Sequence, residues 1–557
     1  MEIASPSARS AAGPSSGTPS LSAYAAKRCV RRTYNDHDPH SPAPEPASPE
    51  LQRRAKEGDE FEDAIYARIL DECPGAVRVP QSQDWERTEK LTLTLMNDPE
   101  VAVILDGRLP DVAGRSGAPD ILVRLSDGWM PVDVKHHLAV KPGTRGKASL
   151  SPISTPTASA MVTRWAAVSG SAGSDRLQLA HYVRMLQDLG AWPTGLAPVG
   201  GIVGSQVDPD SRDTVAPNGS QVDPDSRDTV APSLANGQGI LWHDLTEVMP
   251  DYDEAFAQRQ RAASLEWVQP IHITECADCP WSVYCPHVVG PDDPTFAITT
   301  GLPTRDEWEH VLALAPTLDS LAAADPKVLA DGLAGGKRTG AKMTDLVRRA
   351  RMARDDVALE PLDRTSIWAD LAVPSADIEI DFDLEWDDSP DHRLYQWGLL
   401  IRRDGGPAAY EPIVSFDPLL DDADERALAD AFVTKVSALI DEAQAAGQTI
   451  RIFHWSHPEL SMIRKLPEAH ALVEAHHLDL MAWCKGNVFA RDGYSIKHVA
   501  PALGFHWPMS DAGGANSQVM ATLARLGDET AQEWCLAYNK ADVEAQAAIR
   551  DGLRQLR

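Results

Sequence analysis

The amino-acid sequence predicts an α/β protein with more than one domain, and three features of the chain lead to this expectation. The length of 557 residues corresponds to about two to four domains of ordinary size. Strand-like alternation of apolar and polar residues occurs at 118–137 and again at 376–386. Between these regions, 296–372 is rich in alanine and leucine at helical spacing. We therefore expect an α/β domain at 24–290, a helical bridge at 296–372 and a second α/β domain at 373–557.

Composition and charge restrict the cellular setting. The chain carries a formal net charge of −30 and seven cysteines, an odd number. It does not open with a charged segment followed by an apolar stretch, and it contains no run of about eighteen apolar residues, so we expect a cytoplasmic protein without membrane spans. Because the negative charge repels phosphate at long range, any nucleic-acid binding must use local basic patches such as 135–147 and the residues around Cys29.

Two polar segments are expected to lie outside the folded domains. Residues 1–23 are rich in Ser, Ala, Pro and Gly, which predicts a disordered tail. The stretch GSQVDPDSRDTVAPN at 204–218 is repeated almost without change at 219–233. Two polar copies are too few for a repeat fold, so we expect an exposed insertion loop over 204–236.

The first α/β region contains charged residues that suit metal-dependent chemistry. An amphipathic helix carries Glu62 near the edge of its apolar stripe. In the strand hairpin that follows, Asp120 opens the first strand, and Asp133 and Lys135 lie two apart on the second, hence on one face. Carboxylates of this kind can hold Mg²⁺ or Mn²⁺, and the lysine can orient a water molecule. The alternative is a solvated hairpin with ordinary surface charges.

This arrangement resembles the PD-(D/E)XK nuclease signature. Pro119-Asp120 is followed after thirteen positions by the triplet Asp133-Val134-Lys135, and the helix with Glu62 precedes both. Downstream, Gln178 and Tyr182 share one face of a helix and resemble the Gln-x-x-x-Tyr motif of the RecB-like branch. The resemblance implies a restriction-endonuclease-like core in which Asp120 and Asp133 are metal ligands. It also implies the catalytic set Glu62, Asp120, Asp133, Lys135, Gln178 and Tyr182.

A cysteine cluster follows the same region. Cys276, Cys279 and Cys285 lie within ECADCPWSVYC at 275–285. Thiolates this close in a reducing compartment favour metal binding over disulfides, and ligand type alone does not separate zinc from an iron–sulfur cluster. Several RecB-like nucleases carry one cysteine before the core and three after it, and these hold a 4Fe-4S cluster. This resemblance implies that Cys29 is the fourth ligand and that the cluster is structural, with zinc as the alternative.

The second α/β region carries a separate acidic set. Asp383 and Glu385 belong to a strand whose polar face is wholly acidic, and Tyr538 and Asp542 lie four apart on one face of a C-terminal helix. An acidic face repels itself unless solvent or cations neutralise it, so a solvent-exposed sheet edge is the alternative to a metal site. The four residues resemble the RNase H-like DEDD 3′-to-5′ exonuclease family. The resemblance implies that Asp383, Glu385 and Asp542 hold metal ions and that Tyr538 orients the attacking water.

The middle motif of that family, an Asn and a Phe-Asp pair at the start of a helix, is not evident in this chain. FHWSHPEL at 453–460 offers Glu459, and HHLDLM at 476–481 offers Asp479. Either residue could supply the missing carboxylate as a metal ligand.

The order of these parts resembles a bacterial family of RecB-like nucleases with a fused YprB-type RNase H-like domain. That resemblance implies a Mg²⁺- or Mn²⁺-dependent nuclease, an exonuclease rather than an endonuclease, acting on single-stranded DNA or RNA in DNA repair or nucleic-acid processing. The alternatives are a nucleic-acid-binding accessory protein with one or both centres inactive, and a zinc-stabilised RNA-processing enzyme. No Gly-x-x-x-x-Gly-Lys-Ser/Thr loop occurs, so any helicase or ATPase is expected to be a separate protein.

Overall fold

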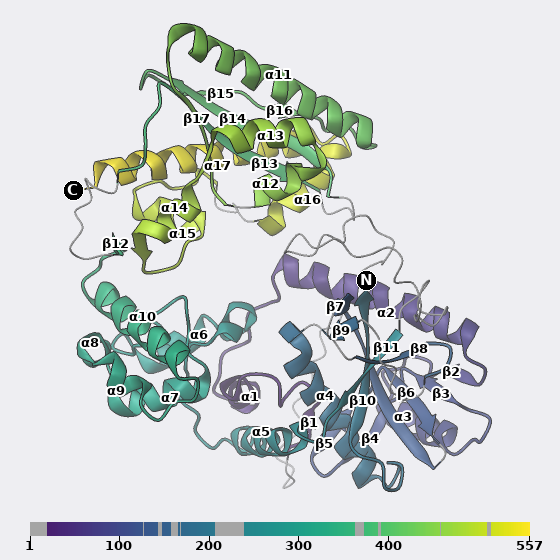
Figure 1. The fold of residues 1–557 in the computed structure, drawn as a ribbon. Coiled ribbons are helices and arrows are strands. Elements are labelled where there is room, and N and C mark those ends of the chain that lie inside the picture. The colour runs from purple at the N-terminus through teal and green to yellow at the C-terminus, as the bar shows by residue number, and fades with distance from the viewer. Residues whose placement is uncertain are drawn as a thin grey trace. The chain divides into compact units, whose positions relative to one another are not determined.

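The computed structural model describes most of the chain and divides it into two compact units (Figure 1). The described residues are 19–125, 127–142, 148–156, 165–167, 169–206, 239–362, 372–387, 392–456, 458–509 and 514–556. One unit comprises Met1–Pro270 with Glu275–Val288, and the other comprises Ile271–Thr274 with Val289–Arg557. Most of the duplicated segment predicted to be an insertion loop lies outside the described residues.

The first unit is built on a mixed sheet. Its described strands are β2 (Ala76–Arg78), β3 (Val103–Leu105), β6 (Ile121–Leu125), β7 (Gly128–Pro142), β8 (Ser149–Pro152), β9 (Trp165–Ala167), β10 (Val199–Gln206) and β11 (Gly239–Asp244). Their order is β2-β3-β6-β7-β10-β11-β8, and β9 pairs with β7. The predicted hairpin is confirmed, because β6 and β7 pair antiparallel with Ile121 opposite Val132. β10 runs parallel to β7 on its other side, so the hairpin lies in the interior of the sheet.

Helices cover both faces of this sheet. Successive residues of β6 point to opposite faces. Val123 packs with α2 (Pro49–Glu72), the predicted amphipathic helix, whereas Leu122 packs with α4 (Ser169–Asp188). The remaining helical segments up to Val289 are α1 (Val30–His37), α3 (Trp85–Met96), α5 (Val248–Ala263), the short 3₁₀ helix η1 (Thr274–Asp278) and α6 (Tyr284–Val289).

A small additional sheet involves the predicted N-terminal tail. It joins β1 (Leu21–Ser22), β5 (Arg115–Gly117) and β4 (Leu109–Val112). β1 pairs in parallel with β5, and Leu21 is buried in the core of the first unit. The expectation of disorder over 1–23 is therefore wrong for Leu21–Ser22, because Leu21 gains apolar burial and both residues gain strand partners. Residues 1–18 lie outside the described part of the chain.

The region predicted to be a helical bridge is helical from Arg305 to Arg354. Its helices are α7 (Arg305–Leu314), α8 (Leu318–Ala323), α9 (Pro326–Ala330) and α10 (Lys337–Arg354). They enclose a core that includes Trp308 and Leu346. After α10, a short strand β12 (Leu359–Pro361) pairs antiparallel with β19 (Val488–Ala490). The helical region thus belongs to the same compact unit as the C-terminal sheet.

The C-terminal part of the second unit is a mixed sheet flanked by helices. Its described strands are β13 (Ile378–Trp386), β14 (Leu394–Arg403), β15 (Ala409–Tyr410), β16 (Ile413–Val414), β17 (Ile450–His454) and β18 (His477–Asp479). Their order is β15-β14-β13-β17-β18, with β16 paired to β14. The helices are α11 (Asp422–Ala446), α12 (Pro458–Met462), η3 (Ile463–Lys465), α13 (Pro467–His476), α14 (Leu480–Asn487), α15 (Ile496–Ala502), α16 (Gly514–Arg525) and α17 (Glu529–Gln555). Within the part of the chain that the structure describes, every helix is too short or too polar to span a bilayer.

β13 is the predicted alternating strand, and it lies inside the sheet rather than at an edge. It pairs antiparallel with β14 and parallel with β17. On its apolar face, Phe382 contacts Phe432 of α11. On its acidic face, Asp381 accepts a hydrogen bond from Arg550 of α17 at 2.6 Å. The alternative of a solvent-exposed acidic edge is therefore wrong, because a helix covers this face and supplies arginine to it.

Candidate active sites

Three carboxylates of the C-terminal domain meet beside β13. Asp383 and Glu385 lie two apart on this strand and share the face that α17 covers. Asp542 comes from α17 itself. One oxygen atom from each carboxylate lies within 4.8 Å of the other two. Glu385 and Asp542 are 9% and 8% exposed, so little water remains to weaken the repulsion between these charges.

Burial and mutual repulsion determine the pKa values of these carboxylates. Burial raises the pKa of Asp383 well above its usual range, and the charges of Glu385 and Asp542 raise it further. Burial also raises the pKa of Glu385, to about 8, and the charge of Asp542 is the next cause. A divalent cation would relieve both effects, since it favours the ionised carboxylates. The donor set fits such an ion, because Mg²⁺ and Mn²⁺ prefer carboxylate oxygens.

A buried amide holds the two carboxylates of β13. Asn539 of α17 is fully buried, and its Nδ2 donates to Asp383 Oδ2 at 2.8 Å. The same side chain also hydrogen-bonds Glu385. Its Oδ1 accepts from the Tyr410 hydroxyl at 2.9 Å, which fixes the orientation of the amide. Sequence analysis missed Asn539, although its position three residues before Asp542 puts both on one face of α17.

Gly398 leaves the space that this amide occupies. It lies on β14 opposite Asp383, and a methyl group on its Cα would overlap Asn539 Oδ1. We expect Gly398→Ala to move Asn539 away from Asp383 and to reduce metal-dependent cleavage by this domain roughly tenfold, as measured by initial rates on a labelled strand. Gly486→Ala is the matched control, because an added methyl group would meet no atom within 4 Å outside the backbone of its own helix, and α14 accepts alanine. Equal rates for the two variants would contradict the positioning role of Asn539.

Asp542 is held from another direction by the region around α15. Its Oδ1 accepts from Lys497 Nζ at 3.0 Å and from Trp507 Nε1 at 2.6 Å. The Lys497 ammonium lies 3.7 Å from the centre of the Trp507 ring. Sequence analysis missed Lys497 and Trp507, which lie 45 and 35 positions from Asp542, because no periodic spacing links residues that far apart.

Tyr538 lies next to the same carboxylate, as the sequence predicted for a shared helical face. It is buried, hydrogen-bonded to Asp542 and stacked on Trp534 with ring planes 7° apart. Burial raises the pKa of Tyr538 far above its usual value, and the charges of Asp542 and Glu385 raise it further. The hydroxyl therefore keeps its proton at neutral pH and remains a hydrogen-bond donor.

The two candidates for a fourth carboxylate differ in their surroundings. Glu459 is buried, and its charge contributes to the raised pKa of Asp383. It is not part of the described group whose oxygens meet within 4.8 Å. Asp479 caps α14, because its side chain accepts the backbone N–H of Ala482 at 2.8 Å. The capping role explains an aspartate at this position without a metal.

The predicted residues of the first unit also gather around β7. Asp133 is fully buried and forms an ion pair with Lys135. Gln178 of α4 donates to Asp133 Oδ1 at 3.1 Å, and Asp120 accepts the backbone N–H of Val134 at 2.6 Å. Burial and the charge of Asp133 raise the pKa of Asp120. Burial alone would lower the pKa of Lys135, but Asp133 and Asp120 outweigh this effect and raise it, so the lysine is charged.

Two tyrosines support this site. The Tyr66 hydroxyl donates to Glu62 at 2.6 Å and lies 3.1 Å from the carbonyl oxygen of Asp120. Burial raises the pKa of Glu62, and the hydrogen bond from Tyr66 partly offsets this. Tyr182 is buried and donates to the carbonyl oxygen of Ala118, just before Asp120. The structure thus brings Glu62 to Asp120 through Tyr66 and makes Tyr182 a support for the backbone there.

Lys27, one of the basic residues next to Cys29 that the sequence predicts to contact phosphate groups, is a further cation at this site. Its Nζ donates to Gln178 Oε1 at 2.5 Å and lies 4.5 Å from the centre of the Tyr24 ring. The segment before Cys29 therefore places a cation beside Gln178.

The cysteine cluster joins two distant segments of the first unit. Cys29 precedes α1, Cys276 lies in η1, Cys279 follows η1, and Cys285 lies in α6. None of the four forms a disulfide. The Glu275 carboxylate accepts the backbone N–H of Cys29, and Asn35 Nδ2 donates to Cys285 Sγ at 3.6 Å. Segments near the two ends of the unit therefore meet at these thiols.

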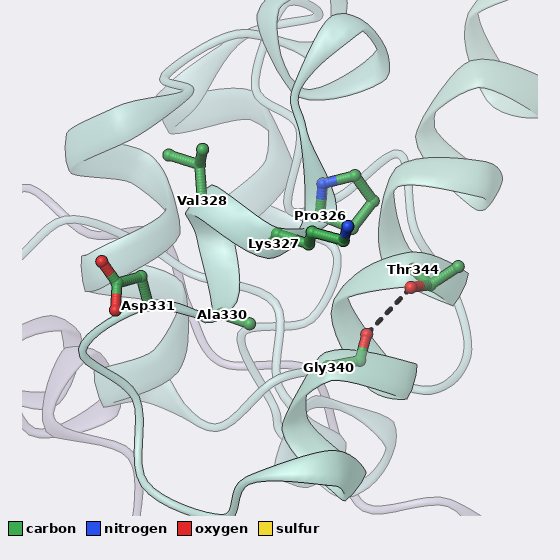
Figure 2. A pocket seen from close by; sticks show the side chains of 7 residues that line it. All are labelled: Pro326, Lys327, Val328, Ala330, Asp331, Gly340 and Thr344. Atoms are coloured by element: carbon green, nitrogen blue, oxygen red, sulfur yellow. Dashed lines mark hydrogen bonds between the residues drawn. The ribbon is translucent and has the colours of Figure 1, made fainter.

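A pocket of about 450 Å³ lies apart from all of these residues, between α9 and α10 (Figure 2). It is lined by Pro326, Lys327, Val328, Ala330, Asp331, Gly340 and Thr344. One lysine and one aspartate make no cluster of catalytic or metal-binding groups, so the candidate sites are the two acidic clusters and the thiols.

Comparison with known proteins supports the C-terminal site. Residues 382–554 match the family model of the RNase H superfamily, and this span contains Asp383, Glu385 and Asp542. Neither the curated proteins nor the solved structures give a match. Domains of this superfamily are in general metal-dependent nucleases, which implies a nucleic-acid substrate and agrees with an acidic group able to bind a metal ion. The C-terminal part of this chain is therefore an RNase H-like domain.

Proposed function

We propose that this chain is a metal-dependent nuclease whose RNase H-like domain hydrolyses phosphodiester bonds at Asp383, Glu385 and Asp542. The observation that carries the proposal is the approach of these carboxylates to within 4.8 Å inside the span that matches the RNase H superfamily. Ionised carboxylates this close and this buried repel one another strongly unless a cation binds between them.

The side chains of this centre have distinct tasks in hydrolysis. Asp383, Glu385 and Asp542 hold Mg²⁺ or Mn²⁺, which when bound lowers the pKa of water and neutralises phosphate charge. Asn539 fixes the orientation of Asp383, since its own amide is buried and hydrogen-bonded. Tyr538 keeps its proton, and once Asp542 holds the ion its hydroxyl would turn from Asp542 to donate a hydrogen bond to the attacking water or to a phosphate oxygen.

We infer that the substrate is single-stranded DNA or RNA cut from an end. Trp534 is partly exposed and stacked on Tyr538 beside the acidic centre, and aromatic side chains at such sites stack on unpaired bases. Duplexes would require strand separation by a separate helicase or ATPase.

End-labelled strands test this activity directly. Full-length protein is incubated with 3′- and 5′-labelled single strands and duplexes of DNA and RNA, in Mn²⁺ or with a chelator. Shortening of single strands from one end, dependent on the metal, is the expected result. Binding without cleavage of any strand would favour an accessory protein instead.

The raised pKa of Glu385 predicts how metal binding depends on pH. With a pKa of about 8 in the unloaded centre, this group must lose a proton before it holds an ion. The pKa of Asp383 is raised as well, so manganese affinity is expected to rise by at least about tenfold per pH unit below about pH 8. Titration calorimetry between about pH 6 and 9 checks the profile. An affinity independent of pH below 8 would show that the carboxylates are already ionised.

We infer a second nuclease centre in the first unit, where Asp120 and Asp133 would hold a divalent cation. The charged Lys135 supports this inference, because an ammonium beside two carboxylates can stabilise the charge that develops on phosphate. Lys135→Met in an Asp383→Asn background should remove any remaining metal-dependent cleavage. Lys56→Met, which alters an exposed ion pair, is the control. Cleavage that survives Lys135→Met would exclude this centre.

We propose that the thiols hold a 4Fe-4S cluster rather than zinc. The four thiols are free of disulfides and come from segments that meet in the first unit, and four cysteine thiolates are the ligand set of a 4Fe-4S cluster. Anaerobically purified protein should contain iron that is lost in Cys285→Ser and retained in Cys73→Ser. Zinc in place of iron would overturn the assignment.

A further inference from the structure

We propose that the RNase H-like centre binds a single divalent cation and that Lys497 takes the position of a second one. This inference rests on the proposed function, because it concerns how the same carboxylates are neutralised. Many phosphodiester-cleaving sites hold two divalent ions about 3.5–4 Å apart, clamped by shared carboxylates. Whether this centre can hold such a pair depends on which oxygen atoms of Asp542 an ion can reach.

One oxygen atom of Asp542 already accepts hydrogen bonds from a lysine and an indole. Its Oδ1 accepts from Lys497 Nζ at 3.0 Å and from Trp507 Nε1 at 2.6 Å. An ion that took this oxygen would have to displace both donors. Displacement of Trp507 would cost the hydrogen bond that its partly buried indole N–H donates to a charged acceptor. An ion can therefore use Asp542 only from its other side.

Lys497 is held firmly at this position. Its backbone lies in the first turn of α15, where its N–H donates to the capping Ser495 hydroxyl at 3.3 Å. Its ammonium lies 3.7 Å from the centre of the Trp507 ring and 5.0 Å from that of Tyr538. Contacts of a cation with aromatic faces add attraction that an exposed lysine lacks. Lys497 is thus a resident cation of the centre rather than a mobile surface charge.

The carboxylates of β13 are also partly engaged. Asp383 Oδ2 accepts from Asn539 at 2.8 Å, and Asn539 is fixed by Tyr410. Asn539 also hydrogen-bonds Glu385, so each of the three carboxylates in the group is engaged by a neighbouring side chain. A single ion needs only one oxygen from each carboxylate, whereas a pair of ions needs a carboxylate that bridges them.

The formal charges agree with one ion. Three carboxylates and the Lys497 ammonium sum to −2, which one divalent cation cancels. A second divalent cation would bring the sum to +2 with Lys497 in place but only to +1 without it, so the lysine raises the desolvation cost of a second ion. Glu459 is not part of this group, and its Oε2 lies 3.7 Å from His454 Nδ1.

Counting bound manganese tests the inference. Full-length protein with Asp133→Asn, which silences the other candidate centre, is compared with the same protein carrying Lys497→Met. Titration calorimetry counts the manganese ions that each protein binds with and without the additional substitution Asp383→Asn, and the difference is the number of ions in the RNase H-like centre. Electron paramagnetic resonance separates an isolated ion from a spin-coupled pair. We expect one isolated ion in the parent and a coupled pair in Lys497→Met.

Two further variants serve as controls. Lys540→Met removes the same charge from an exposed position of α17, where Lys540 pairs with Glu544, and should bind one ion like the parent. Lys497→Arg keeps the charge and should also bind one ion. A coupled pair in the parent would overturn the inference even if Lys497→Met failed to fold, and so would a single ion in folded Lys497→Met. The absence of any manganese that depends on Asp383 would instead overturn the proposed function.

Discussion

Replacing Asp383 with asparagine is expected to lower metal-dependent cleavage by the RNase H-like centre by about a thousandfold or more. The amide keeps the shape of the side chain but removes one of three charges that hold the ion, and it removes the anionic acceptor of Asn539. A loss of several kcal/mol of transition-state stabilisation corresponds to this factor, at about 1.4 kcal/mol for each tenfold change. Initial rates on an end-labelled strand in Mn²⁺, measured in a Lys135→Met background that silences the first unit, give the measurement.

The control for this variant is Glu533→Gln, the same chemical change at an exposed position of α17. Its rate should equal that of the parent. Without metal, Asp383→Asn should be at least as stable as the parent, because it removes a carboxylate that burial and neighbouring charges disfavour. Parental cleavage by Asp383→Asn, combined with loss of cleavage in Lys135→Met, would mean that the first unit alone carries the activity.

Replacing Arg550 with methionine is expected to destabilise the second unit by about 3–5 kcal/mol. Arg550 is fully buried and donates to Asp381 at 2.6 Å, with Glu379 at 3.4 Å and Asp551 at 3.2 Å. Its removal leaves the buried Asp381 carboxylate without a compensating charge. Urea unfolding followed by tryptophan fluorescence gives the free energy of unfolding.

Two comparisons separate burial from charge. Arg403→Met breaks a pair with Glu442 whose side chains are about half exposed, and it should cost less than about 1 kcal/mol. The double variant Arg550→Met with Asp381→Leu should recover most of the stability, because two apolar side chains replace a buried ion pair. If Arg550→Met were as mild as Arg403→Met, water would have to reach the pair in the folded state.

Local spacing predicted those parts of the fold that depend on neighbouring residues. Alternation with a period of two identified β13 and the β6–β7 hairpin, and a spacing of four put Tyr538 beside Asp542. Alternation says only that the two faces of a strand differ. It did not show that α17 covers the acidic face, so the exposed-edge alternative stayed open until the packing was known.

The residues that sequence analysis missed owe their positions to tertiary packing. Asn539, Lys497 and Trp507 act on the acidic group from helices and loops whose docking no periodicity encodes. Asp479 was a candidate ligand that the structure shows as a helix cap. An aspartate between a strand and a helix can have either role, and the sequence alone does not separate them.

The repeating pattern of β13 makes its alignment in the sheet ambiguous. A slip of two residues against β14 would keep apolar side chains in the core and would put Asp381 where Asp383 now lies. Two contacts distinguish the alignments: Arg550 reaches Asp381, and Gly398 lies opposite Asp383 with space for Asn539. The ion pair between Arg550 and Asp381 therefore helps to fix the alignment of β13 in which Asp383, and not Asp381, becomes the metal ligand.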